Sequence, residues 1–152
     1  MTTASTGTVG ANPSLLAFLA QRTPNAVVVT DPTGRIEWVN DGFSRLTGYT
    51  PEEVQGCVPG AILQGPRTDA DTIASMEAAL ANKEGFDVEL VNYAKNGEPY
   101  WIHIDCQPIV ENGKLTHYIA IESDVTERKT LEENLLRAER VARLGHWTLD
   151  VA

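Results

Sequence analysis

The chain has 152 residues, room for one domain of ordinary size with flanking segments. Its formal net charge is −9 and its basic residues form no stripe, so a nucleic-acid partner is not expected. No apolar run reaches the roughly 20 residues that a membrane span needs, and the amino terminus lacks the features of a secretory signal. Two cysteines without an export signal indicate free thiols and a reducing, cytoplasmic compartment.

The first part of the chain predicts a helix followed by a hairpin. Residues 1–13 are typical of a disordered tail, and residues 14–22 predict a short helix with leucines on its apolar side, which Pro24 stops. Two strands then follow, 26–31 and 35–40, joined by a Pro-Thr-Gly turn.

Capping residues mark two short helices after the hairpin. Asn40 or Asp41 can cap the first, which should end near Gly48. Thr50 caps the second, and Glu53 completes a capping box with it.

The next part predicts one longer helix and three strands. The helix spans 68–85 and carries Ile73, Met76 and Leu80 on one face. The strands span 86–94, 99–110 and 115–125, and an Asn-Gly pair predicts a hairpin at each of the two connections. Two strands, several helices and three strands give an α+β fold, in which a five-stranded antiparallel sheet carries helices on one face.

Apolar residues beyond residue 125 change to a coiled-coil spacing. Residues 126–144 predict a linker helix, either part of a coiled coil or a single amphipathic helix packed on its own sheet. Residues 144–152 return to strand-like alternation, and we interpret 145–152 as the start of a following domain. The apolar positions at coiled-coil spacing are Leu131, Leu135, Ala138 and Ala142.

The segment from Ala26 to Lys129 resembles a PAS sensor domain. The resemblance is carried by "TDPTGRIEWVNDGFSRLTGYTPEEVQG", the paired Asn-Gly hairpins and "SDVTERK". The stretches "ILQGPRTD", "ELVNYAKNGEPYW" and "QPI" resemble most closely the flavin-binding light-oxygen-voltage branch and the flavin redox-sensing PAS domains. The resemblance implies a PAS fold over 26–125 with a bound flavin.

The light-sensing branch bonds a cysteine to its flavin, in the pattern Gly-x-Asn-Cys-Arg-x-Leu-Gln-Gly-Pro. Alignment on Leu63-Gln64-Gly65-Pro66 puts Gly60 at the cysteine, and alignment on Gly56 puts Pro59 there. Cys57 lies three residues before the first of these positions, too far for bond formation. We therefore interpret Cys57 as a small apolar filler.

The phosphate-binding residues of the light-sensing branch are also replaced. Its two arginines align with Ala61 and Glu77, and Glu77 would repel a dianionic phosphate. Arg67 is a possible replacement in the adjacent loop. A pyrophosphate that carries an adenosine past the loop would also fit, so the resemblance favours FAD, with FMN as the alternative.

The resemblance places the flavin ring edge at Asn92 and Glu122. Asn92 matches a flavin-facing asparagine, although a strand asparagine can also face solvent. Ile102 replaces a second asparagine, and Glu122 replaces the glutamine that faces flavin N5. Strand alternation directs Glu122 inward with Tyr118 and Ala120, unless a bulge turns it to water. The other residues that we expect around the cofactor are Thr30, Ile62, Leu63, Gln64, Met76 and Ile104.

The sequence thus predicts a cytoplasmic flavin-binding sensor of redox state or oxygen. A cysteine-less light sensor that photoreduces its flavin, with Trp38, Trp101 and Tyr118 as electron donors, is a second hypothesis. A ligand-free PAS dimerisation module is a third. We expect a homodimer formed through 14–22 and 126–144, with an output domain, plausibly a histidine kinase, in a parent chain. His103, His117 and His146 have no metal-ligand spacing, and no nucleophile–base pair or phosphate loop indicates an enzyme in this fragment.

Overall fold

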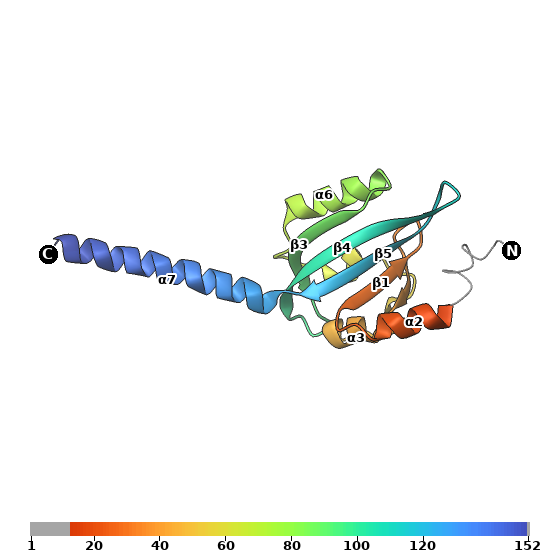
Figure 1. Ribbon diagram of the computed structural model, residues 1–152, viewed down its shortest axis with the longest axis horizontal. Coiled ribbons are helices and arrows are strands. Elements are labelled where there is room, and N and C mark those ends of the chain that lie inside the picture. Colours follow the sequence, from red (N-terminus) through yellow and green to blue (C-terminus); the bar gives the residue numbers. More distant parts are fainter. Residues whose placement is uncertain (1–12, 152) are drawn as a thin grey trace.

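The computed structural model describes residues 13–151 as a sheet domain with helices, from which a long carboxy-terminal helix projects (Figure 1). The predicted disordered tail over 1–13 lies outside the described residues except for Pro13, which begins a helix. This helix, α2 (Pro13–Gln21), matches the predicted one to within a residue at each end.

The five strands form one antiparallel sheet in the order β2-β1-β5-β4-β3. Their bounds are β1 Ala26–Thr30, β2 Ile36–Val39, β3 Phe86–Tyr93, β4 Pro99–Glu111 and β5 Lys114–Asp124. Helices α3 (Asp41–Thr47), α4 (Pro51–Val54), α5 (Pro59–Leu63) and α6 (Ala70–Ala81) connect β2 to β3. Contacts of α3 with β1, α4 with β2 and α6 with β3 confirm the predicted α+β fold.

Both Asn-Gly pairs form hairpin turns, but the turns differ. Asn112 and Gly113 both have positive φ angles, 53° and 76°, as the two-residue turn of a tight hairpin requires. In the hairpin between β3 and β4 only Gly97 of the Asn-Gly pair has a positive φ. There the Ala94 amide donates a hydrogen bond to the Glu98 carbonyl across a three-residue turn. Asn-Gly therefore predicted each hairpin but not its turn type.

Asn40 is the residue that caps α3, and it also ties three elements together. Its side-chain oxygen accepts from the Val27 amide at 2.8 Å and the Phe43 amide at 3.0 Å. Its side-chain nitrogen donates to the carbonyls of Ala20 and Asn25. This fully buried amide thus fixes β1 and the end of α2 against the start of α3.

The predicted capping box at Thr50 and Glu53 is confirmed, and the helix it caps is short. The structure adds α5, which we expected to be part of a loop. Pro59 at its first turn is the sequence signal for it, but five residues without a side-chain cap give little helical periodicity to detect.

Helix α7 (Thr126–Val151) corrects two expectations for the end of the chain. Strand-like alternation over 144–152 is wrong, because α7 continues to Val151. The alternative of a helix packed on its own sheet is also wrong, because α7 points away from the domain (Figure 1) and those of its leucines whose side chains are described, among them Leu131 and Leu135, are exposed. Gly145 is tolerated inside a helix at modest cost, so nothing in "LGHWTLDV" forces an end. The following domain expected from 145 stays a prediction.

Candidate functional site

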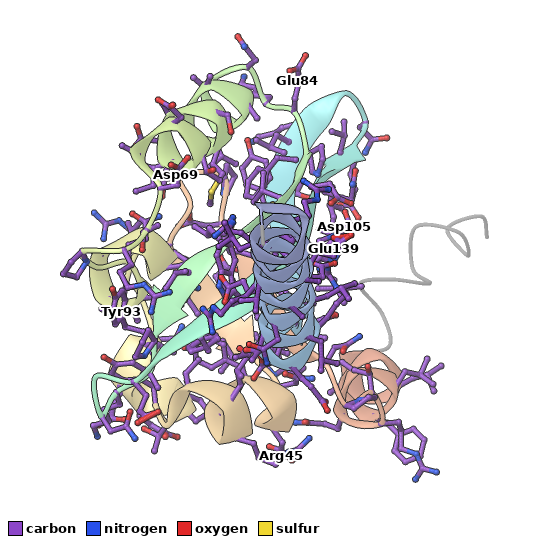
Figure 2. The ribbon with its side chains drawn as sticks, turned by 90° about the vertical axis from the view of Figure 1, so that its left-hand side faces the viewer. Arg45, Asp69, Glu84, Tyr93, Asp105 and Glu139 are labelled. Carbon is purple, nitrogen blue, oxygen red and sulfur yellow. The ribbon has the colours of Figure 1, made fainter. Side chains whose placement is uncertain are left out.

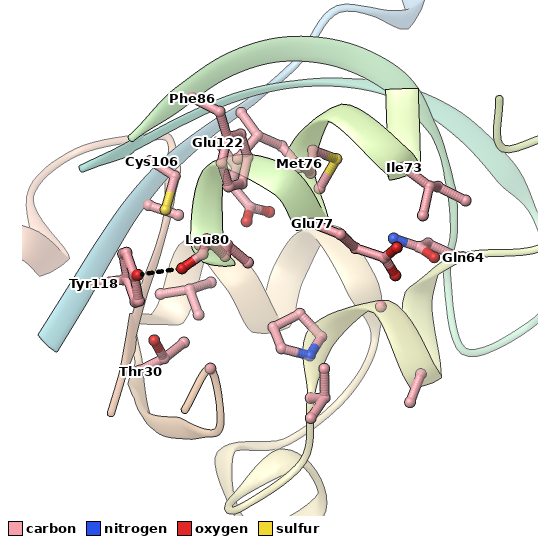
Figure 3. A pocket seen from close by; sticks show the side chains of 18 of the residues that line it. Thr30, Gln64, Ile73, Met76, Glu77, Leu80, Phe86, Cys106, Tyr118 and Glu122 are labelled. Atoms are coloured by element: carbon pink, nitrogen blue, oxygen red, sulfur yellow. Dashed lines mark hydrogen bonds between the residues drawn. The ribbon is translucent and has the colours of Figure 1, made fainter. Parts of the chain in front are cut away.

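A cavity of about 440 Å³ lies between the inner face of the sheet and the helices α5 and α6. Ile104 and Cys106 of β4 and Tyr118, Ala120 and Glu122 of β5 form its floor. Figure 3 shows Met76 and Leu80 of α6 facing these strands across the cavity. The walls are mainly apolar, and the volume is in the range of small-molecule sites.

Glu122 is the exceptional residue of this cavity. In the sheet Glu122 lies opposite Ile104 of β4 on one side and opposite Ala26 of β1 on the other. The residue is only 5% exposed. Its Oε1 atom has no hydrogen-bond partner. Burial raises the pKa of Glu122 to about 7, because the surroundings disfavour its charged form. The predicted inward orientation is confirmed, and the alternative in which a bulge turns Glu122 to water is wrong.

The thiol that lines the cavity is Cys106, not Cys57. Burial, and then the charge of Glu122, raise the pKa of Cys106 to about 11. Cys57 lies in the turn after α4, where its Sγ is 3.8 Å from the Glu53 carbonyl oxygen. Sequence reasoning gave Cys106 no role, although strand alternation puts it on the same face of β4 as Ile104 and so indicates a thiol there.

The segment after α5 is fastened to β3 rather than to the cavity. The Arg67 amide donates to the Tyr93 hydroxyl at 2.8 Å, and the Thr68 hydroxyl donates to the Val91 carbonyl at 2.6 Å. Gly65 is required here, because an added Cβ would lie 2.4 Å from the Tyr93 ring. The Arg67 side chain is exposed and does not line the cavity.

The mouth of the cavity is polar but carries no cation. Gln64 and Ala61 of the α5 region and Glu77 of α6 line it, and Figure 3 shows the Glu77 carboxyl pointing toward Gln64. Glu77 and Glu122 are the charged groups among the described lining residues, so none of those residues offers a positive charge to a phosphate. Ala61 and Glu77 thus stand where the resemblance expects arginines.

The structure brings seven of the twelve predicted cofactor contacts to the cavity and leaves five away from it. Those that line the cavity are Thr30, Gln64, Met76, Ile104, Tyr118, Ala120 and Glu122. Those that do not are Ile62, Leu63, Arg67, Asn92 and Ile102. Leu63 is buried in one apolar core cluster, and Ile62 packs against that cluster. Ile102 is buried in a second apolar core cluster. Their assignment as cofactor contacts stays a prediction.

Asn92 is buried, so the alternative of a solvent-facing asparagine is wrong. Asn92 is the cross-strand partner of Tyr100 between β3 and β4. Burial raises the pKa of Tyr100, and the interaction with the Asn92 side chain opposes part of that rise. The Tyr100 hydroxyl nevertheless has no hydrogen-bond partner of standard geometry. This polar pair lies outside the cavity lining.

Sequence reasoning missed part of the lining. Phe86 at the start of β3, Val58 just before α5 and Pro59 at the first position of α5 line the cavity without having been predicted to do so. Phe86 stands at the first position of a strand, where alternation has little predictive strength, and α5 itself was unexpected. Ile73 and Leu80 also line the cavity, and the helical face on which they lie with Met76 was predicted.

The strand that carries Glu122 leads directly into α7, and the start of α7 is fixed to the sheet. The Thr126 hydroxyl accepts from the Trp101 amide at 2.9 Å, and the Val125 amide donates to the Trp101 carbonyl. Lys129 lies over the Trp101 ring at 4.7 Å and pairs with Glu89 of β3 at 3.1 Å. Arg128 also pairs with Glu89.

Two further observations concern the described residues. Within residues 13–151, no group of three or more histidine, cysteine or acidic side chains is arranged to hold a metal ion. None of the described helices combines the length and apolar character that crossing a membrane requires.

Comparison with known proteins agrees with this architecture. The family model of the PAS domain matches residues 24–127, so the chain belongs to the PAS domain family, which consists of sensor modules. A solved structure titled an RNA-binding light-oxygen-voltage receptor is similar over 90% of this chain and 40% of its own, with a TM-score of 0.76 and 28% identity. The light-oxygen-voltage domain of the Erythrobacter litoralis EL346 blue-light activated histidine kinase is similar over 69% of this chain and 99% of its own, with a TM-score of 0.64 and 26% identity.

Two curated relatives extend the comparison. A blue-light-activated histidine kinase of Brucella anthropi is 32% identical over 164 aligned positions, which cover 92% of this chain and 32% of the relative. The bacterioopsin transcriptional activator of Halobacterium salinarum is 37% identical over 107 positions, which cover 70% of this chain and 16% of the relative. The chain thus spans about a third or less of the length of these relatives.

Proposed function

We propose that the chain is a sensor module that holds a flavin non-covalently in the cavity between α5, α6 and the sheet. The observation that carries this proposal is the Oε1 atom of Glu122, a buried polar atom without a partner in an apolar cavity. A buried polar atom of this kind calls for a ligand that bonds to it. Apolar walls with one inward hydrogen-bonding group suit a flat ring system with polar edges.

A bound flavin would supply a redox couple whose ring nitrogen N5 gains a proton on reduction. Glu122 could form a hydrogen bond with either redox state of the ring, because its protonated form donates a hydrogen bond and its ionised form only accepts one. A pKa of about 7 makes both forms accessible near neutral pH. Glu122 is therefore suited to report redox state.

The route from Glu122 to an output is short. Glu122 lies two residues before Asp124, the last residue of β5, and α7 begins at Thr126. The Asp124 carboxylate accepts from the Thr126 amide at 2.9 Å. A change in hydrogen bonding at Glu122 would bias the position of β5 and hence of α7. We propose that α7 passes this change to an output domain of a cytoplasmic parent protein, a histidine kinase.

Within this proposal we favour FAD over FMN. The terminal phosphate of FMN is dianionic, and none of the described lining residues is a cation to pair with it. The two negative charges of FAD are divided between its two phosphates, so neither phosphate would need the paired cations that a single dianionic phosphate needs. Chromatography of the heat-released cofactor decides this point: FMN alone would overturn FAD while leaving flavin binding intact.

The test of the function is the purified protein itself. We expect a yellow protein with one flavin per chain, and a colourless one would favour a ligand-free dimerisation module. Glu122→Gln should retain the flavin and shift its reduction midpoint by about 30 mV or more, a tenfold change in equilibrium for a two-electron couple. Glu77→Gln makes the same chemical change at the cavity mouth and should leave the midpoint near its wild-type value. An unchanged midpoint in both Glu122→Gln and Glu122→Ala would remove Glu122 from the mechanism.

A cysteine-less light sensor is the second candidate. Tyr118 favours it, because its phenol lines the cavity, whereas the other expected electron donors, Trp38 and Trp101, do not. Photoreduction in the absence of oxygen should then slow in Tyr118→Phe. Cys57→Ala should respond to light as wild type does, and a reversible bleach that disappears only in Cys106→Ala would show instead that the cavity thiol reacts.

A further inference from the structure

A second hollow of about 470 Å³ lies at the far end of the sheet from α7. The end of α6, the β4–β5 hairpin and the turn after β1 surround it, and Figure 1 shows the first two at the same end of the molecule. Its apolar walls consist of Pro32, Leu80, Ala81, Val110, Leu115 and Tyr118. We refer to it as the hairpin groove.

The hairpin groove is separate from the cavity described above, although the two share a wall. Leu80 and Tyr118 line both hollows. The Tyr118 hydroxyl donates a hydrogen bond to the Leu80 carbonyl at 3.2 Å, which Figure 3 shows as a dashed line. This bond closes the wall between α6 and β5, so an occupant of the groove need not enter the cavity.

The charge of the hairpin groove is opposite to that of the protein. Lys83 and Lys114 are its charged lining residues, in a chain of net charge −9. Across residues 13–151 neither lysine forms an ion pair. Two acidic residues lie near these lysines but do not line the groove: Glu84 follows Lys83 in sequence, and Glu111 is the cross-strand partner of Lys114. Unpaired ammonium groups beside apolar walls favour an anion with an apolar body.

Lys83 has an unusual backbone conformation at the end of α6. It follows the cap of α6 with a φ of 58°, a left-handed conformation in which glycine or asparagine is usual. A lysine there is less favourable than glycine, because in this conformation the Cβ atom lies too close to the following carbonyl oxygen. Attraction to the carbonyl end of α6 offsets part of that cost, and the same position brings the side chain to the groove.

We propose that the hairpin groove binds an amphipathic carboxylate, with its aliphatic body against Val110 and Leu115 and its carboxylate between Lys83 and Lys114. The argument is charge complementarity at an apolar surface, and it does not rest on flavin binding. A fully polar anion would leave the apolar walls unused, and a neutral lipid would leave both ammonium groups unpaired.

The test is calorimetric titration of the protein as isolated with decanoate, below its micelle concentration and at low salt. We expect saturable binding of one decanoate per chain, weaker binding of decanol, and the weakest binding of decyltrimethylammonium. Affinity for decanoate should fall as salt rises, because exposed charges are screened. Equal binding of decanoate and decanol would overturn the role of the lysines.

Variants locate the site. Lys83→Gln and Lys114→Gln should each weaken decanoate binding by about two- to fivefold, and together by about tenfold. Val110→Asp should abolish it; Val110 is 55% exposed, so this change leaves the core intact. Arg45→Gln on α3 removes the same charge on the opposite side of the molecule from Glu84, the neighbour of Lys83 (Figure 2), and should have no effect. Wild-type affinity in the double lysine variant and in Val110→Asp would show that decanoate binds elsewhere, and the absence of any binding would equally overturn the proposal.

Discussion

A single carboxyl, that of Glu122, gives the sheet a polar group where the rest of the cavity floor is apolar. Ile104, Ala120 and Tyr118 surround it on the same face, and its Oε1 atom has no partner. In the ligand-free protein the fold accepts Glu122 best when it is protonated, since burial of the charged form is costly. This links the cavity to the stability of the domain.

That link predicts how stability depends on pH. The pKa of Glu122 is raised from 4.5 in the unfolded chain to about 7 in the folded protein, so its stabilising effect is complete below pH 4.5 and is lost as pH rises through 7. Between pH 5 and pH 8 the ligand-free wild type should lose about 2–3 kcal/mol of unfolding free energy relative to Glu122→Gln. Urea unfolding of both proteins at the two pH values measures the difference.

Glu89→Gln is the control for this measurement. Ion pairing with Lys129 lowers the pKa of Glu89. The stability that ionised Glu89 contributes is therefore lost only as the pH falls below the pKa of Glu89 in the unfolded chain. It should therefore show no comparable change between pH 5 and pH 8. A wild-type protein that tracks Glu122→Gln across this range would show that Glu122 is hydrated in the folded state.

Among the elements, those with long periodic patterns or strong turn chemistry were predictable from sequence. All five strands, α2 and both Asn-Gly hairpins lie where alternation, helical periodicity and turn residues placed them, and α6 was predicted but is shorter than 68–85, since it spans Ala70–Ala81. Helix α5 was missed because five residues fix too few apolar positions to show a period. The end of α7 was misjudged because a short apolar alternation fits a strand as well as a helix when no breaker is present.

The candidate site was predictable where it depends on strand alternation and not where it depends on loop geometry. The inward positions of Ile104, Tyr118, Ala120 and Glu122 follow from a period of two. Arg67 illustrates the opposite case, since the bond from its amide to Tyr93 fixes its backbone outside the cavity. No local pattern in the sequence encodes a contact between residues 26 positions apart.

The junction between the sheet and α7 predicts a second effect. Glu89 pairs with both Arg128 and Lys129, so Glu89→Gln should loosen the first turns of α7. Amide hydrogen exchange over residues 126–132 should rise by about two- to fivefold, as loss of an exposed ion pair allows. Glu132→Gln breaks only the pair between Arg128 and Glu132 within the helix and should change exchange less. Equal effects of the two variants would show that the Glu89 ion pairs do not hold the helix to the sheet.

Seen as a whole, the molecule carries most of its exposed large apolar side chains on the two terminal helices, α2 and α7. Figure 1 shows α7 as a projection from the domain, and Figure 2 looks along this helix. Phe18 and Leu19 of α2 and Leu131 and Leu135 of α7 are more than half exposed. Apolar helix surfaces of this kind are typical of interfaces, so we expect two copies to associate through α7, with α2 contributing.

Two leucines of nearly equal exposure test this association. Leu135 lies on the predicted seam with Leu131, Ala138 and Ala142, whereas Leu136 is a neighbour about 100° further around the helix. Their exposures are 64% and 59%, so neither substitution should disturb the fold. Leu135→Gln should weaken dimerisation by tenfold or more, since each subunit loses a leucine that the dimer buries, whereas Leu136→Gln should change it little. Sedimentation equilibrium measures both, together with a chain that ends at Glu127, which should associate more weakly still. Undiminished association of that shortened chain would place the interface on the sheet.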